Sequence, residues 1–536
     1  MLANTIQAPS RVSITADELS EGIDLLGLRY SVQVIGSALL DGITTVTPSI
    51  RYLSLSLWLI YQYASEKRPD SAQAFSDYGK RAEAAVVMGN LLAHSSVPGL
   101  IGPITGKKRL AGDDEPTLAP LVQAAAVDIY QAAAERLHLM RLTGNVPQIV
   151  TERALPIVTA VRSRLERTCL PELLAALDGD ADATVSREAL RQLGEAFPMR
   201  HIPEDERHML RNALLPEAPR TSEQPRIATY ACLLRLAELL KRVPTNEEFL
   251  AAACAAERFA APSLDTISDG WLLYCIRDVI AAAHERVMEL VTYALRDLKN
   301  RNLLATPASV LGELLRSTPD VVRGLTAVGL ARDGESLDLM TMRELAKRVG
   351  ELTGMDRRSA NGLNRWAGGF HEEAVQDVLK TSDVGALALL PVAWLLVAQR
   401  VDGLDEAIAY QVLARDEAMR IGIFQTVIPT CQRWLREDQT LIAAIGELME
   451  RTVYQHVSIA WSRMQTDPTK NLALLSEDEG RWRFHGRLFP AGRTGSRIKE
   501  AIGWLEQLGL IDEDGLTEEG EKVLHRISAQ IAGGAE

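Results

Sequence analysis

Aromatic residues are scarce in this sequence of 536 residues, with Phe, Trp and Tyr together at 5%. Because strands are enriched in aromatic and β-branched residues, this scarcity beside abundant Ala and Leu favours helices. Cysteines are also few, and their wide spacing without any C-x-x-C pair argues against a disulfide framework and a zinc site of standard spacing. They are expected to be buried thiols and are Cys169, Cys232, Cys254, Cys275 and Cys431.

No apolar run in the sequence is long enough to cross a membrane. The longest uncharged apolar stretch, residues 384–399, contains Pro391 and is shorter than the roughly 20 residues that a span needs. We expect it to be a buried core helix. Residues 1–22 are polar and carry acids, unlike a signal peptide. The sequence therefore predicts a cytoplasmic protein without membrane contact.

The chain is acidic, with a formal net charge of −13. Such a chain is not attracted to nucleic acid over its whole surface, so any contact of that kind must come from a local basic patch. Hydrophobic residues at 47% and charged residues at 24% are typical of globular proteins. At about 150 residues per domain, the length predicts three or four domains.

Helical spacing of apolar residues begins early in the chain. One helix is expected over residues 48–67, with Thr47 as its N-cap and Pro48 in the first helical position. A second is expected over residues 71–93. The Pro- and Gly-rich stretch that follows, including Lys107, Lys108 and Arg109, is expected to be a mobile basic loop.

Further helices are expected along the rest of the chain. The sequence T-N-E-E at Thr245 resembles a capping box, which predicts a helix start. Long helical patterns cover residues 271–298, 383–414 and 427–465. No strand pair is expected before residue 480.

The local charge reverses near the C-terminus. Between residues 481 and 499 there are six basic residues and no acid, and Trp482, Phe484 and Phe489 lie among them. Basic residues interleaved with aromatics are typical of nucleic-acid contacts. The candidate nucleic-acid-binding residues are Arg481, Arg483, Arg487, Arg493, Arg497 and Lys499.

The order of elements in this segment is equally informative. Residues 482–487 alternate like a short strand, and 494–496 form a plausible helix start, followed by apolar residues on one helical face. Gly509 ends that helix, Asp514-Gly515 predicts a tight turn, and Thr517 predicts the cap of a last helix.

This order resembles the end of winged-helix domains, over about 70 residues. The resemblance implies that the helix after residue 494 is a recognition helix and that Arg493, Arg497 and Lys499 contact phosphates or bases. The sequence departs from the family because the preceding stretch is rich in Pro and Gly and the wing, residues 512–514, is acidic. The alternative is a winged-helix module that only packs against another domain or a partner.

The N-terminal segment, residues 26–64, resembles the opening of a family of uncharacterised bacterial proteins encoded in mobile or anti-phage gene clusters. The resemblance covers about 90 residues and implies no known reaction. Arg51 and Tyr52 stand in its otherwise apolar helix, and a buried structural role is favoured for Arg51 over partner binding. The matching residues are Gly27, Leu28, Gly42, Thr44, Arg51, Tyr52, Ser54 and Trp58.

The sequence contains no complete catalytic or ligand-binding motif. The stretch 102–108 has the wrong glycine spacing for a phosphate loop, and the His and acidic residues at 201–208 are better explained as a solvated helix start. We therefore predict no catalytic residues, no metal and no cofactor, although an enzyme site assembled from distant residues leaves no local pattern.

Together these patterns predict a mainly α, multi-domain protein. The expected domains are an N-terminal helical domain (1–115), a helical middle region (116–220), a helical domain (221–465) and a winged-helix-like domain (466–536). The leading hypothesis is an accessory protein of a bacterial defence or mobile-element system that contacts DNA and other proteins of its operon. The alternatives are a protein-binding helical scaffold without nucleic-acid contact and an enzyme.

Overall fold

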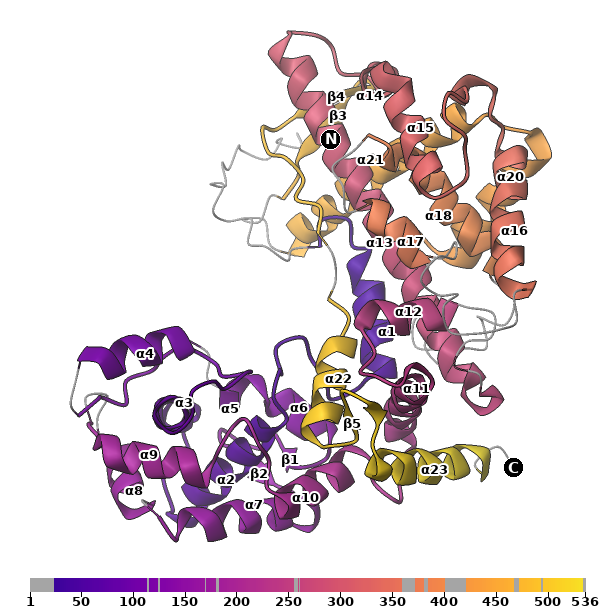
Figure 1. Cartoon of the computed structure of the whole chain (residues 1–536). Helices are drawn as coiled ribbons and strands as arrows, with labels where there is room; N and C mark the ends of the chain where they lie inside the picture. The colour runs from indigo at the N-terminus through magenta and orange to yellow at the C-terminus, as the bar shows by residue number, and fades with distance from the viewer. Residues whose placement is uncertain are drawn as a thin grey trace, which may run out of the picture. The chain divides into compact units, whose positions relative to one another are not determined.

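The computed structural model describes most of the chain, and its fold is mainly helical, as predicted (Figure 1). The only sheets among the described residues are three antiparallel two-stranded pairs, β1–β2, β3–β4 and β5–β6. None of the described helices has the length and apolar character that a membrane span needs. The described residues are 24–112, 115–123, 126–168, 170–179, 183–254, 259, 261–358, 372–379, 384–400, 421–466, 472–492 and 495–533.

The chain forms two compact units. Unit 1 comprises Met1–Gly36, Leu250–Ala261 and Asp265–Thr494. Unit 2 comprises Ser37–Phe249, Pro262–Leu264 and Gly495–Glu536. The predicted domains were contiguous ranges, whereas each unit combines segments that are distant in the sequence. The predicted C-terminal range 466–536 contributes to both units.

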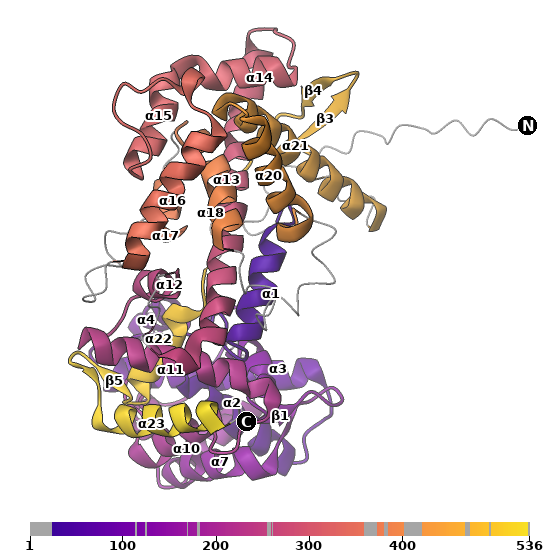
Figure 2. The same ribbon diagram turned by 90° about the vertical axis from the view of Figure 1, so that its right-hand side faces the viewer.

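Unit 1 is built around the helices α13 and α18. Helix α18 packs against α13, α15, α16, α17, α20 and α21 (Figure 2). Every residue of α18 from Ala386 to Val397 is buried, which confirms the predicted core helix. The elements of unit 1 are α13 (Asp265–Asn300), α14 (Pro307–Leu314), η4 (Leu315–Ser317), α15 (Thr318–Ala327), η5 (Leu337–Leu339), α16 (Met342–Arg358), α17 (Glu372–Leu379), α18 (Ala386–Arg400), η8 (Ile423–Val427), α20 (Ile428–Glu437), α21 (Leu441–Thr466), β3 (Leu475–Asp478) and β4 (Arg481–Phe484).

Both ring nitrogens of His284, a polar residue in the core of unit 1, are paired. His284 on α13 is fully buried, its Nδ1 lies 2.7 Å from Thr452 Oγ1, and its Nε2 accepts a hydrogen bond of 3.1 Å from Trp394 Nε1. Burial lowers the pKa of His284 to about 3, so the ring is neutral. This histidine therefore joins three helices of the core.

Unit 2 contains the helices of the N-terminal half of the chain and the last two helices. Helices α3 and α9 pack most closely. The division between the units falls inside α1 (Arg29–Leu39) and α12 (Asn246–Cys254). The other elements of unit 2 are α2 (Arg51–Ser65), α3 (Ala72–Ala93), α4 (Pro103–Gly112), α5 (Ala126–Ile129), α6 (Gln131–Arg136), β1 (Met140–Arg141), β2 (Gln148–Ile149), α7 (Thr151–Leu165), α8 (Leu170–Asp178), α9 (Arg187–Ala196), α10 (Glu204–Leu214), η2 (Thr221–Glu223), α11 (Gln224–Leu240), η3 (Pro262–Leu264), α22 (Ile498–Gln507), β5 (Ile511–Asp512), β6 (Gly515–Leu516) and α23 (Glu518–Gly533).

Two of the three predicted helix caps are present. Thr517 accepts a hydrogen bond from the backbone N–H of Gly520 at the start of α23. Thr245 and Glu248 form the reciprocal bonds of a capping box before α12. The predicted cap at Thr47 is wrong, because α2 begins only at Arg51 and the Thr47 hydroxyl instead donates to the carbonyl oxygen of Thr44.

Three other local predictions differ from the structure. Lys107 and Lys108 lie on helix α4 instead of in a loop, because residues 103–112 complete helical hydrogen bonds after Pro103. Strands β1, β2 and β3 precede residue 480. The pattern 427–465 forms two helices, α20 and α21, since Asp438 adopts a left-handed conformation (φ 51°) between them.

Arg51 has the buried structural setting that was favoured for it. Its side chain is 0% exposed and makes two parallel hydrogen bonds, of 3.1 and 2.9 Å, to the carboxylate of Glu206. Its remaining nitrogen donates to the carbonyl oxygens of Pro198 and His201, and the guanidinium lies over the ring of Phe197. This arginine therefore ties α2 to α10 and to the segment between α9 and α10.

Candidate functional site

The predicted nucleic-acid-binding residues do not belong to one compact unit. Arg481, Arg483 and Arg487 are in unit 1, whereas Arg497 and Lys499 are in unit 2. Arg493 lies outside the described residues. The run of basic residues in the sequence is therefore distributed over two separately packed bodies.

The three arginines of unit 1 lie on or beside the β3–β4 hairpin. Arg481 and Arg483 are exposed on β4, which pairs with β3 so that Asp478 lies opposite Arg481. Asp478 also forms an ion pair of 3.5 Å with Arg483. Two further acids, Glu477 and Glu479, are exposed in the same hairpin. Acids of the neighbouring strand therefore offset the positive charge of β4.

The opposite face of β4 anchors the hairpin to unit 1. Trp482 and Phe484 are buried. The backbone N–H of Trp482 donates to the carbonyl oxygen of Ala305 over 2.8 Å, and the Lys299 ammonium lies 5.8 Å from the centre of the Phe484 ring. The aromatics that interleave with the arginines in the sequence thus serve the core, because a strand directs alternate side chains to opposite faces.

Helix α22 buries its apolar face in unit 2. The indole N–H of Trp504 donates to the carbonyl oxygen of Thr47 over 2.8 Å. The side-chain oxygen of Gln507 accepts hydrogen bonds of 3.0 Å from the Ser49 hydroxyl and from the backbone N–H of Ile50. Gln507 therefore supplies the cap of α2 that Thr47 was expected to supply.

The basic residues of α22 face different surroundings. Arg497 is partly buried and donates to the Ser37 hydroxyl over 2.9 Å. Lys499 is exposed in the first turn of the helix. Across residues 495–533 four residues are basic and eight are acidic, so this segment is acidic as a whole.

The last two strands and α23 follow the predicted order, and they are packed against other helices. Gly515 (φ 100°) lies so close to the end of α11 that an added Cβ would come within 3.0 Å of Ala237 O and Arg242 N. Arg211 on α10 donates to the carbonyl oxygen of Leu508 over 2.8 Å and pairs with Glu519 at 3.3 Å. The β5–β6 turn is therefore docked within unit 2.

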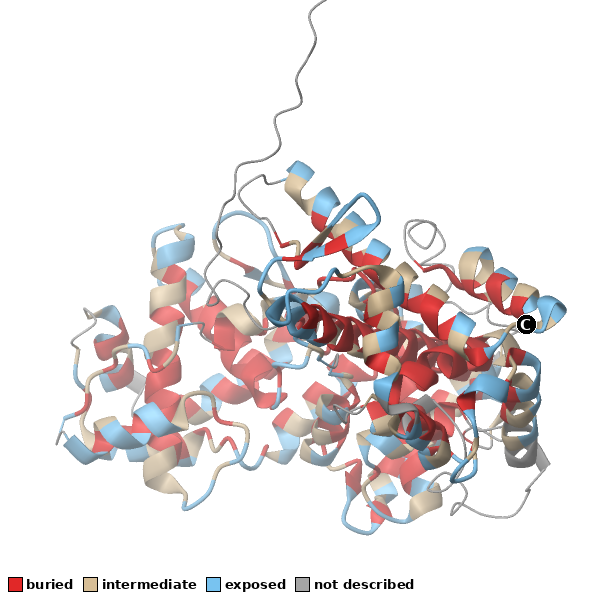
Figure 3. Cartoon of the chain, turned by 90° about the horizontal axis from the view of Figure 1, so that it is seen from above, coloured by how far each residue is buried: buried red, intermediate tan, exposed pale blue. Residues whose placement is uncertain are grey.

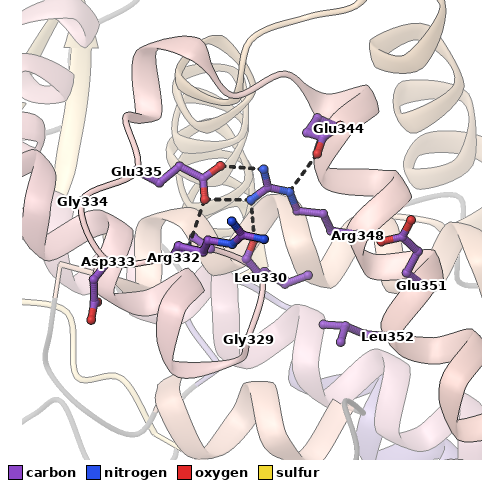
Figure 4. A pocket seen from close by; sticks show the side chains of 11 residues that line it. Gly329, Leu330, Arg332, Asp333, Gly334, Glu335, Glu344, Arg348, Glu351 and Leu352 are labelled. Atoms are coloured by element: carbon purple, nitrogen blue, oxygen red, sulfur yellow. Dashed lines mark hydrogen bonds and ion pairs between the residues drawn. The ribbon is translucent and has the colours of Figure 1, made fainter.

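One cavity of about 690 Å³ lies in unit 1 between α16 and the loop 329–335 (Figure 4). Arg348 points from α16 to this loop and binds both carboxylate oxygens of Glu335, at 2.6 and 2.9 Å, and the carbonyl oxygen of Leu330 at 3.0 Å. The Arg348 guanidinium lowers the pKa of Glu335 to about 2. The ion pair between Arg348 and Glu335 therefore holds the loop against α16.

A different kind of surface lies on α21. Tyr454 and Trp461 are 45% and 58% exposed, which is unusual for large aromatic side chains. They are seven residues apart, so they project from one face of the helix. Every exposed residue of α21 from Tyr454 onwards is uncharged, and these residues are Tyr454, Ser458, Trp461, Ser462, Gln465 and Thr466. We call these six residues the aromatic face of α21.

Most of the described helices have a buried side and an exposed side (Figure 3). Trp58, Trp271, Trp394, Trp434 and Trp504 are all among the largest fully buried side chains. Among the tryptophans that the structure describes, Trp461 is the exposed one, and it marks a candidate binding surface. Its sequence signal is the spacing of Tyr454, Ser458 and Trp461, but that spacing is equally typical of a buried face, and sequence reasoning missed it.

Comparison with models of protein families, with curated proteins and with solved structures finds no match for the chain.

Proposed function

We propose that the chain is a protein-binding helical scaffold that contacts a partner protein through the aromatic face of α21. The carrying observation is the exposed pair Tyr454 and Trp461 on one uncharged helix face. Trp and Tyr are enriched among the residues that dominate binding energy at protein interfaces, whereas charged residues are depleted from interface cores. The docking of the C-terminal elements within unit 2 supports the same reading, because these elements serve packing there.

The first prediction concerns partner capture. We expect the Tyr454→Ala, Trp461→Ala double variant of the full chain to lose at least one co-purifying protein by about tenfold or more, because truncating anchor aromatics removes most of an interface's affinity. Quantitative mass spectrometry of affinity-purified samples from the source organism measures this. The matched control is Ile104→Ala, Leu142→Ala, which removes two exposed apolar side chains (72% and 49% exposed) from unit 2. Equal recovery of every protein by all three chains would contradict the proposal.

DNA association through a winged-helix-like C-terminus is the second candidate function. The order α22, β5–β6, α23 favours it, as do the exposed side chains of Arg481 and Lys499. Under this candidate the chain is a cytoplasmic accessory protein of a bacterial defence or mobile-element system, with the N-terminal resemblance as support. The acids of β3 and of residues 495–533 weigh against a continuous basic surface in either unit.

The second prediction separates the two candidates. If the chain binds DNA, fluorescence anisotropy with a random duplex will show affinity that falls at least about tenfold between about 50 and 200 mM salt, because counterions are released from the phosphates. Two double variants locate the contact. The first, Arg481→Ala, Arg483→Ala, tests the basic residues of unit 1, and the second, Arg497→Ala, Lys499→Ala, tests those of unit 2. If only the scaffold proposal holds, the chain will not bind the duplex even at the lower salt concentration.

A further inference from the structure

We infer that the partner of the aromatic face of α21 is a basic amphipathic helix. This inference rests on the proposed scaffold function and adds the chemistry of the partner. It is carried by the spacing of the two aromatics and by the charges at one end of the face.

The spacing of the aromatics suits a helix. Seven residues of an α-helix rise by about 10.5 Å, so Tyr454 and Trp461 form two apolar contact points about two turns apart. Ser458 lies between them and is small, which leaves room for an apolar side chain of the partner. A helix that packs nearly parallel or antiparallel to α21 presents apolar residues at the same two-turn interval.

The charges beside Tyr454 are acidic. Burial and the carboxylates of Glu477 and Glu450 raise the pKa of Tyr454. Neither Glu450 nor Glu477 forms an ion pair within the described part of the chain. The β3–β4 hairpin carries three exposed acids, Glu477, Asp478 and Glu479, against the two exposed arginines of β4, so negative charge is in excess beside Tyr454.

Arg451 and Arg463 of α21 already interact with other groups of unit 1. Arg451 pairs with Glu447 at 3.8 Å and lies over the ring of Trp394. Arg463 donates to the carbonyl oxygen of Asp24 over 2.5 Å. Because Arg451 and Arg463 are bound within unit 1 and the acids of the hairpin outnumber its exposed arginines, a cationic partner is complementary to this surface.

The test uses two labelled peptides and the full chain. One peptide is a Leu/Lys amphipathic helix of about 18 residues, and the other has the same Leu positions with Glu in place of Lys. Fluorescence anisotropy at low salt measures binding. We expect the Leu/Lys peptide to bind, with at least about tenfold weaker affinity for Trp461→Ala and about threefold or more for Glu450→Gln, Glu477→Gln.

The matched control addresses the net negative charge of the whole chain. Glu513→Gln, Asp514→Asn removes two exposed acids from the β5–β6 turn and is expected to leave the affinity unchanged. Thermal unfolding of each variant verifies that it folds. The inference is overturned if the control weakens binding as much as Glu450→Gln, Glu477→Gln, if the Leu/Glu peptide binds equally well, or if neither peptide binds.

Failure of this inference is distinguishable from failure of the scaffold proposal. If partner capture depends on Tyr454 and Trp461 while the peptide result is negative, the aromatic face binds a protein whose contact residues are not a basic helix. If partner capture is also unchanged in the double variant, both fail.

Discussion

Replacing Gly194 with alanine is expected to lower the free energy of unfolding by about 3 kcal/mol or more. Gly194 lies on α9 at the point where this helix crosses α3, and Gly89 occupies the same point on α3. A Cβ added at Gly194 would come within 3.0 Å of the carbonyl oxygen of Gly89 and of the Cβ of Ala93. Backbone atoms cannot give way as a flexible side chain can, so the two helices must separate.

Separation of these helices would also break polar contacts. Asn90, the residue after Gly89, donates to the carbonyl oxygen of Phe197 over 3.0 Å and accepts from the backbone N–H of Met199 over 2.7 Å. Both contacts join α3 to the end of α9. They depend on the close crossing and would be lost with it.

Urea unfolding followed by circular dichroism measures the change in Gly194→Ala. The matched control is Gly112→Ala at the end of α4, where no atom lies within 4 Å of an added Cβ. We expect this control to be neutral or slightly stabilising, because alanine has the higher helix propensity. A loss below about 1 kcal/mol in Gly194→Ala would show that the crossing tolerates the extra carbon.

Local signals in the sequence predict the helices well. The caps at Thr245 and Thr517 are made by residues within three positions of the helix start, so a short window contains all that is needed. The predicted start of α2 is wrong because the backbone N–H of Ile50, the residue before the helix, is bound by Gln507, which lies more than four hundred residues away in the sequence. A cap supplied by a residue so distant in the sequence cannot be predicted from a local pattern.

The candidate sites show the same limit. The basic run 481–499 is continuous in the sequence, but neutralisation by Asp478 and the division of the run between two units follow from the fold. The exposure of Trp461 likewise depends on which face of α21 other elements cover. Residue type and spacing therefore indicate candidate binding surfaces, but the packing of the fold determines which of these surfaces are exposed to solvent.

Replacing Glu83 with glutamine is expected to change the dependence of stability on pH. Glu83 lies on α3, is 3% exposed, and one of its oxygens accepts a hydrogen bond of 2.7 Å from the backbone N–H of Ala126 at the start of α5. Its other oxygen has no hydrogen-bond partner within the described residues. Burial, with a smaller contribution from Asp128, raises the pKa of Glu83 from 4.5 to about 7.

The sign of the effect follows from this raised pKa. The folded chain binds the proton of Glu83 more tightly than the unfolded chain does, so the protonated carboxyl favours folding. Its contribution is fully present below pH 4.5 and is lost as the pH rises through about 7, with a total of about 3 kcal/mol. Above pH 7 the folded protein must hold a buried negative charge.

Glutamine keeps an acceptor for the Ala126 N–H but carries no charge at any pH. The stability of Glu83→Gln therefore does not fall through deprotonation of this residue as the pH rises. Between pH 5 and pH 8 the free energy of unfolding of the wild type, measured relative to Glu83→Gln by urea titration, is expected to fall by about 2 to 3 kcal/mol. Glu188→Gln, at an exposed glutamate of α9, is the matched control and is expected to follow the wild type. If Glu83→Gln and the wild type instead keep a constant difference across this range, Glu83 does not titrate near neutral pH.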